Sequence, residues 1–125
     1  MKREEIFFIR DILSSIEYIQ QFSKGLTKEK FMIDKLKQSA IIRHFEIIGE
    51  AVKNISIQTR EKYPEIEWKK IAGSRDIFIH GYFMVDYEAV WEIIQNKLSI
   101  LKIDVQKVKD YFDSKNKTHI KNGNK

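Results

Sequence analysis

The sequence predicts an all-α fold, an antiparallel up-and-down bundle of four to five helices. Apolar residues recur at three- and four-residue steps through most of the chain, which is the period of an amphipathic helix. Runs of alternating apolar and polar residues, which would indicate strands, are absent. The connections between the periodic segments are short, and short connections favour antiparallel neighbours in a bundle.

Two helices are expected in the first half of the chain. The first covers residues 3–23, and Gly25 suits the position just after a helix end. Thr27 is expected to cap the second, which contains no proline and should run unbroken to about Asn54. The middle of this helix, residues 40–52, is apolar on more than one side, which predicts a place at the centre of a bundle or at a dimer seam.

A short helix and a third main helix are expected next. Ser56 is suited to cap the short helix, and Pro64 stops it because the residue before a proline is driven out of the helical region. The third main helix is expected over residues 68–79, with Gly81 where it should end.

The last helix is expected to start at the cap Asp86 and to reach about Phe112, with a break near Ser99. One helical domain is therefore predicted over residues 1–113, followed by a flexible, lysine-rich tail over residues 114–125. Of the net charge of +5, +4 lies in this tail, on Lys115, Lys117, Lys121 and Lys125. The domain itself carries the remaining +1, so charge alone argues only weakly for a nucleic-acid partner.

The composition excludes several classes of protein. The chain has no cysteine, which rules out a disulfide framework, a thiolate zinc site and a cysteine nucleophile. It has no apolar stretch of about 18 residues that could span a bilayer, and no signal-peptide pattern. Phosphate-binding glycine loops and metal-binding histidine patterns are also missing. We expect a cytoplasmic protein that needs no membrane, metal or cofactor.

The best candidate for chemistry is His80. On the expected helix Asp76 lies one turn earlier, where its carboxylate can fix the imidazole tautomer and favour the protonated form. The negative end of the helix dipole acts in the same direction. Together they are expected to raise the histidine pKa, which suits a general acid or base. The plainer alternative is an Asp76–His80 pair at a helix end, with Arg75 on the surface.

Arg75 offers a permanent charge and a planar donor fork suited to phosphate. On a straight helix, however, it would lie about 140 degrees around the axis from His80. The two side chains would then meet only if the helix distorts or a second subunit supplies the partner group. His44, on the second helix, is expected to be a surface or interface residue.

At these residues the chain resembles the HEPN superfamily, whose signature is an arginine, four to six residues, and a histidine. It resembles more closely the HepT branch, with Arg-x4-His-x-Tyr, which Arg75, His80 and Tyr82 match. The likeness covers about residues 3–112 and includes the segment 40–51 of the second helix. Glu67 departs from it, since proline is common there in relatives.

This resemblance implies an HEPN-like α-helical homodimer that cleaves RNA without metal and acts as the toxin of a toxin–antitoxin pair. It assigns catalysis to Arg75 and His80, drawn from two protomers around one cleft, with Asp76 in support. The implied antitoxin is an MNT-type nucleotidyltransferase that transfers AMP from ATP to Tyr82, which also contacts RNA. The alternative is a non-catalytic helical adaptor that binds such a nucleotidyltransferase.

Three polar residues on the second helix are a further possible part of the site. They either border the cleft or pair with each other across one turn: Arg43, Glu46 and Glu50.

Overall fold

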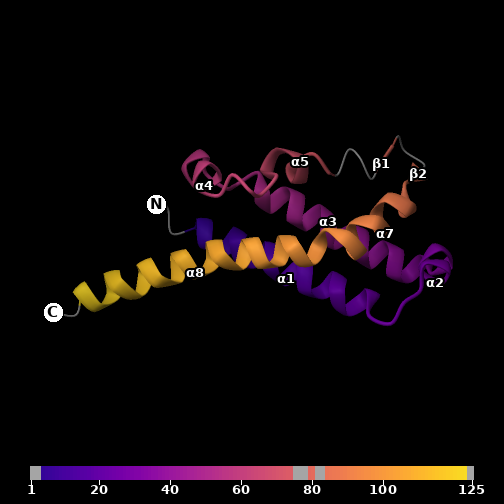
Figure 1. The fold of residues 1–125 in the computed structure, drawn as a ribbon, viewed down its shortest axis with the longest axis horizontal. Helices are drawn as coiled ribbons and strands as arrows, with labels where there is room; N and C mark the ends of the chain where they lie inside the picture. Colours follow the sequence, from indigo (N-terminus) through magenta and orange to yellow (C-terminus); the bar gives the residue numbers. More distant parts are fainter. Residues whose placement is uncertain (1–3, 75–78, 81–83, 124–125) are drawn as a thin grey trace.

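The computed structural model describes the backbone of residues 4–74, 79–80 and 84–123, and the side chains of residues 4–74 and 85–115. Its centre is formed by three helices (Figure 1), and the fold is all-α, as predicted. The helices are α1 (Glu5–Ser23), α3 (Lys35–Val52) and α8 (Leu98–Gly123). The shorter elements are α2 (Lys28–Ile33), α4 (Ile57–Lys62), α5 (Trp68–Ala72), β1 (Ile79–His80), β2 (Met84–Val85) and α7 (Tyr87–Asn96).

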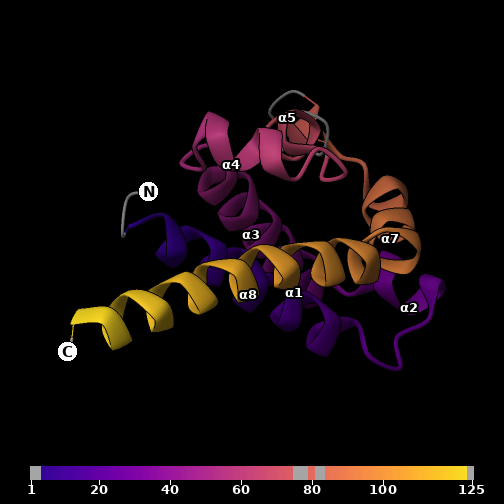
Figure 2. The same ribbon diagram turned by 60° about the vertical axis from the view of Figure 1, so that its left-hand side comes forward.

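The core lies where α1 packs against α3 and α8. Side chains at three- and four-residue steps on each helix meet there and are buried, as the amphipathic pattern requires. The central ones are Ile9, Ile16 and Ile19 of α1, Ile41 and Ile48 of α3, and Val105 and Val108 of α8. Seen from a second direction, α8 still crosses α1 and then continues past it (Figure 2).

The expected single helix from Thr27 to Asn54 is wrong in one respect, because it is broken at Asp34. This residue has non-helical backbone angles (φ −94°, ψ 89°), and its side chain accepts a hydrogen bond from the Lys37 amide at 3.0 Å. It therefore caps α3 at the point where α2 ends. The break leaves Ile33 and Leu36 80% and 81% exposed.

The short helix α4 confirms its expected cap and stop. The Ser56 hydroxyl accepts a hydrogen bond from the Thr59 amide at 3.1 Å, and the helix ends at Lys62, just before Pro64. Arg60 then closes α3, because its guanidinium donates to the carbonyl oxygens of Val52 at 2.7 Å and Ile55 at 3.1 Å. The Val52 carbonyl also accepts a hydrogen bond from the Ile55 amide at 3.1 Å, so Arg60 adds a second donor at the end of α3.

The break expected near Ser99 in the last helix is confirmed, since α7 ends at Asn96 and α8 begins at Leu98, with Lys97 between them. The expected cap of α7 is also confirmed, since Asp86 Oδ1 accepts a hydrogen bond from the Ala89 amide at 3.1 Å. Helix α8 continues to Gly123, so the predicted domain boundary at residue 113 lies inside a helix. The flexibility of residues 114–125 stays a prediction. No helix in the part of the chain that the structure describes is long and apolar enough to cross a membrane.

Candidate active site

The segment that carries the Arg-x4-His-x-Tyr residues lies between α5 and α7. Its described part is a two-stranded antiparallel ladder, in which Ile79 pairs with Val85 and His80 pairs with Met84. The backbone of His80 is therefore extended, and the expected helix over residues 68–79 is wrong. Helix α5 already ends at Ala72, and Gly73 follows as its C-cap. Glycine disfavours helix continuation, which is the physical reason for the early end.

His80 lies in a strand and not in a helix. Asp76 and His80 do not share a continuous helix, so one-turn spacing and a helix dipole cannot be invoked for the imidazole. Arg75, Asp76 and Tyr82 lie outside the described residues, as does the side chain of His80. Their distances from one another, and their roles, stay predictions.

Gly49 of α3 fixes the point where the chain enters this segment. A Cβ atom at Gly49 would lie 3.5 Å from the Ile71 carbonyl oxygen and 3.7 Å from that of Ala72, so the backbone of α5 rests directly on α3. The Ser74 hydroxyl donates to the Ile71 carbonyl at 2.7 Å and is the last described group before Arg75. A larger residue at position 49 would have to displace α5, and with it the start of the segment.

Trp68 holds the other end of α5. Its side chain is buried, and its indole N–H donates to the Tyr63 carbonyl at 3.0 Å. A buried indole that keeps a hydrogen-bond partner packs without an unsatisfied donor. Helix α5 is thus positioned by Gly49 at one end and by the α4–α5 connection at the other.

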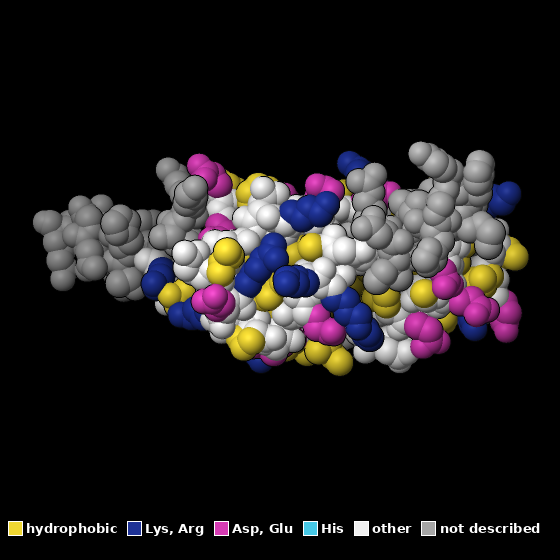
Figure 3. Space-filling view, turned by 90° about the horizontal axis from the view of Figure 1, so that it is seen from above, with side chains coloured by type: hydrophobic (Ala, Val, Ile, Leu, Met, Phe, Trp, Pro, Cys, Tyr) yellow, Lys and Arg dark blue, Asp and Glu magenta, His cyan; other side chains and the backbone are white. Residues whose placement is uncertain are grey.

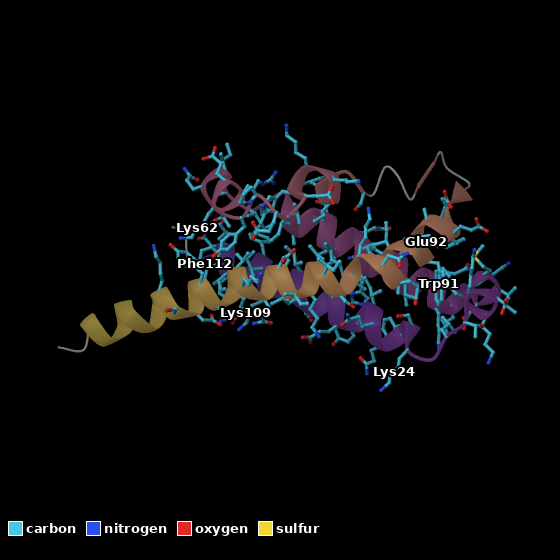
Figure 4. The ribbon with its side chains drawn as sticks, viewed as in Figure 1. Lys24, Lys62, Trp91, Glu92, Lys109 and Phe112 are labelled. Atoms are coloured by element: carbon cyan, nitrogen blue, oxygen red, sulfur yellow. The ribbon has the colours of Figure 1, made fainter. Side chains whose placement is uncertain are left out.

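Helix α7 fixes the point where the chain leaves the segment. Trp91 points from α7 toward α2 (Figure 4) and stacks on the buried ring of Phe31, with centroids 5.3 Å apart and planes at 29°. Tyr87 meets the same ring edge-on at 6.1 Å. Each of these aromatic contacts adds to the gain from burial. The start of α7, directly after β2, is therefore packed against α2.

The polar residues of α3 form a charged row beside Gly49. Arg43 pairs with Glu46 (Nη1 to Oε2, 3.5 Å), which is the expected alternative of pairing across one turn. Glu50 instead pairs with Lys53 (Nζ to Oε1, 3.3 Å). Glu46 and Glu50 flank Gly49 within one helical turn, so they lie near the point where α5 meets α3. That Arg43, Glu46 and Glu50 border a cleft stays a prediction.

His44 is the histidine whose side chain the structure describes, and it belongs to a different surface. A hydrogen bond of 3.1 Å joins its Nδ1 to the hydroxyl of Ser15 on α1. Its ring stacks on Tyr18, with centroids 4.9 Å apart. Burial, and secondarily the charge of Arg43, lowers the pKa of His44 below its ordinary value. The neutral imidazole is therefore favoured at this contact between α1 and α3.

Metal chemistry has no candidate centre in the described part of the chain, where no group of three or more His, Asp or Glu side chains could hold an ion. What the described residues do define is a class: a small all-α bundle that presents an Arg-x4-His-x-Tyr segment between two packed helices.

The family follows from the comparison with known proteins. The family model described as "Ribonuclease HepT-like" matches residues 12–108, which include the whole motif, so the chain belongs to this family of the HEPN superfamily. These residues run from α1 to α8 and include both contacts that fix the motif segment.

Several curated proteins are similar to the chain at about 40% identity. A Methanocaldococcus jannaschii protein named a putative RNase is 44% identical over 107 residues, 86% of this chain and 92% of its own length. The "Probable ribonuclease HepT" of Thermococcus cleftensis is 39% identical over 109 residues, 87% of this chain and 99% of its own length.

A further relative from Methanocaldococcus jannaschii is longer than the match. This "Gamma-glutamylcyclotransferase and putative RNase" is 40% identical over 119 residues, which are 95% of this chain. The match spans only 53% of that relative, about half its length. No solved structure matches the chain significantly.

Proposed function

We propose that the protein is a metal-independent endoribonuclease that acts as the toxin of a toxin–antitoxin pair. The observation that carries the proposal is the family match over residues 12–108, which contains Arg75, His80 and Tyr82 in the motif spacing. The relatives named as ribonucleases support RNA as the substrate. The contacts of α5 with Gly49 and of α7 with Phe31 support a segment held in place at both ends.

The proposed reaction uses the RNA itself as the nucleophile. The ribose 2′-oxygen attacks the adjacent phosphorus, a P–O2′ bond forms, and the P–O5′ bond breaks. The proton leaves the 2′-hydroxyl and a proton is delivered to O5′, with His80 as general acid or base. Arg75 stabilises the negative charge that builds up on the phosphoryl oxygens. The products are a 2′,3′-cyclic phosphate and a 5′-hydroxyl end.

A homodimer is also part of the proposal. A separation of about 140 degrees between Arg75 and His80 would hold only on one straight helix, and His80 lies in β1. The dimer therefore rests on the relationship to the family. Asp76 is kept in its supporting role, in which its carboxylate orients the His80 imidazole and favours its protonated form.

The proposed off-switch is a covalent change at Tyr82. An MNT-type nucleotidyltransferase would join the Tyr82 oxygen to the α-phosphorus of ATP, and pyrophosphate would leave. The attached AMP adds bulk and negative charge beside His80 and Arg75. It should therefore exclude and repel the phosphates of RNA.

The decisive experiment compares the wild-type protein with His80→Ala on total RNA in EDTA. We expect defined cleavage products from the wild type, and a rate lower by about 10²–10⁴ in the variant, since that is the usual contribution of a general acid or base. Equal cleavage by both proteins would show that His80 has no catalytic role. No cleavage by either would favour the non-catalytic adaptor.

The switch is tested by co-expression with an MNT-type nucleotidyltransferase and measurement of intact mass. We expect a gain of one or more AMP units in the wild type and none in Tyr82→Phe. A gain that persists in Tyr82→Phe would place the modification on another residue. Cleavage by the modified wild-type protein at its full rate would show that the modification is not an off-switch.

A further inference from the structure

Two lysines and a tyrosine converge between α4 and α8, away from the motif segment. The Lys62 ammonium of α4 lies 3.5 Å from the centre of the Tyr111 ring, and the Lys115 ammonium lies 4.9 Å from it. Figure 4 shows Lys62 close to Phe112, the neighbour of Tyr111 on α8. The neighbouring ammonium groups of Lys115 and Lys62 lower the pKa of Tyr111. The phenolic oxygen therefore lies in a positive field.

Two aromatic neighbours fix the ring of Tyr111 in place. The ring meets Tyr63 edge-on at 6.3 Å and Phe112 at 5.6 Å, and Phe112 is only 2% exposed. The hydroxyl is thus presented from a fixed ring, while the two lysine side chains can adjust around it. A rigid donor between two mobile cations is a suitable arrangement for an oxyanion.

The positive charge of this cluster is not balanced by its described neighbours. Neither Lys62 nor Lys115 forms an ion pair with a carboxylate in residues 4–74 or 85–115. Asp113, two residues from Tyr111 on α8, is paired with Lys109 at 2.6 Å and with Arg10 at 3.7 Å. Two ammonium groups that share one ring repel each other, and a bound anion would relieve that repulsion.

We propose that Lys62, Lys115 and the Tyr111 hydroxyl form a binding site for the phosphodiester backbone of single-stranded nucleic acid. The phosphate oxygens would accept hydrogen bonds from the two ammonium groups and from the phenol. Because both lysines lie over the ring of Tyr111, the site would bind a backbone phosphate, and no base would stack on the ring. The choice of RNA as the natural ligand rests on the proposed ribonuclease function.

The surface between this site and the motif segment suits a nucleic-acid strand. Lysine and arginine side chains gather over the middle of the face that carries α4 and α5, with acidic side chains among them (Figure 3). On α5, Lys69 and Lys70 are exposed, and Lys70 pairs with Glu67 at 3.5 Å. A strand bound at Tyr111 could extend along α4 and α5, where exposed Glu61 and Glu65 also lie and Lys69 is the next cation for a phosphate to contact.

The test measures binding of fluorescent single-stranded RNA, and of DNA of the same sequence and length, by anisotropy in EDTA. All proteins carry His80→Ala, so that RNA cleavage is slow during the measurement. We expect Lys62→Ala with Lys115→Ala to weaken both ligands about tenfold or more. The slope of log K against log salt should fall by up to about 1.4, since each lost phosphate contact on a single strand contributes about 0.7.

Two controls separate this site from net charge. Lys30→Ala with Lys35→Ala removes the same charge from exposed lysines on α2 and α3, and should leave affinity within about twofold. Tyr111→Phe keeps the ring and removes the hydroxyl, and should weaken binding about two- to fivefold. Equal losses from the two lysine pairs would overturn the proposal. Unfolding temperatures of all variants show that each one is folded.

Failure of this binding site can be distinguished from failure of the proposed ribonuclease activity. If the wild-type protein cuts no RNA but the Lys62–Lys115 variant loses DNA and RNA binding, the binding site is supported and the proposed activity is rejected. If the wild type cuts RNA and the variant binds and cuts with unchanged Kd, KM and kcat, the site falls and the activity stands. Loss of nucleotidyltransferase binding with unchanged RNA affinity would make this a protein-docking surface, and would also overturn the proposal.

Discussion

The bundle of α1, α3 and α8 and the segment from α5 to α7 are held in different ways. The bundle buries aliphatic side chains along the length of three helices, so its stability is spread over many contacts. The segment is fixed at a few points: α5 on Gly49, the cap at Asp86, and Trp91 on Phe31. Mutations in the bundle should therefore change stability, whereas mutations at these points should change the position of the motif.

The largest expected effect on stability lies in the bundle. Ile16 of α1 is fully buried, and Ile16→Ala should lower the free energy of unfolding by about 2–5 kcal/mol in urea denaturation. Cleavage per folded molecule should not change. Ile103 of α8 is 59% exposed and is the matched control, because Ile103→Ala should change stability by no more than about 0.5 kcal/mol. Similar losses from the two isoleucines would contradict this description of the core.

A large side chain at Gly49 should lower activity as well as stability. Gly49→Leu places a branched side chain against the α5 carbonyls and should cost about 1–3 kcal/mol of stability. Because α5 must shift, the cleavage rate should fall by more than the loss of folded protein explains. In Gly49→Ala the new Cβ would make ordinary contacts at 3.5–3.7 Å, so activity should persist, with stability unchanged or higher by up to about 1 kcal/mol. Full activity in Gly49→Leu would show that α5 does not position the motif.

The cap of α7 should have a smaller effect. Asp86→Ala removes the acceptor for the Ala89 amide and should destabilise the protein by about 1 kcal/mol, measured by chemical unfolding. Asp86→Asn keeps an acceptor at the same place and should lose little, because asparagine caps helices about as well as aspartate. If Asp86→Asn is as destabilised as Asp86→Ala, the negative charge and not the hydrogen bond stabilises the cap.

The smallest effect is the pH dependence at His44. The pKa of His44 is lowered in the folded protein from its ordinary value of 6.5, so the unfolded chain binds the proton more readily. Stability should therefore fall as the pH drops through about 6.5, and this part should vanish in His44→Asn. Unfolding temperatures at about pH 7.5 and about pH 5.5 measure it. A wild-type difference no larger than that of His44→Asn would remove His44 as its cause.

The sequence indicates where helices occur better than it indicates where they break. The apolar period located α1, and the caps Ser56 and Asp86 located the starts of α4 and α7. The break at Asp34 was missed because one non-helical residue scarcely disturbs the apolar pattern on either side. The position of Asp34 before Lys35 was nevertheless a usable signal, since aspartate is a strong N-cap residue.

The motif could be recognised from Arg75, His80 and Tyr82, but its local structure could not. A helix that continued past Gly73 would bring Asp76 and His80 together, whereas the backbone of His80 lies in a strand. Strand pairing depends on a chain reversal that apolar periodicity does not report. Gly49 was also missed, although a glycine inside an apolar helix often marks a close contact.

Helix α8 runs past the rest of the molecule, and this has a kinetic consequence. Among the described side chains of α8, the last one that is fully packed is Phe112, yet the backbone stays helical to Gly123 and projects from the bundle (Figure 1). In the sequence, residues 114–123 carry lysines and no acid, at the helix end whose dipole favours cations. Charge on a projecting helix acts on an approaching polyanion before contact, so it should raise the rate of encounter more than the lifetime of the complex.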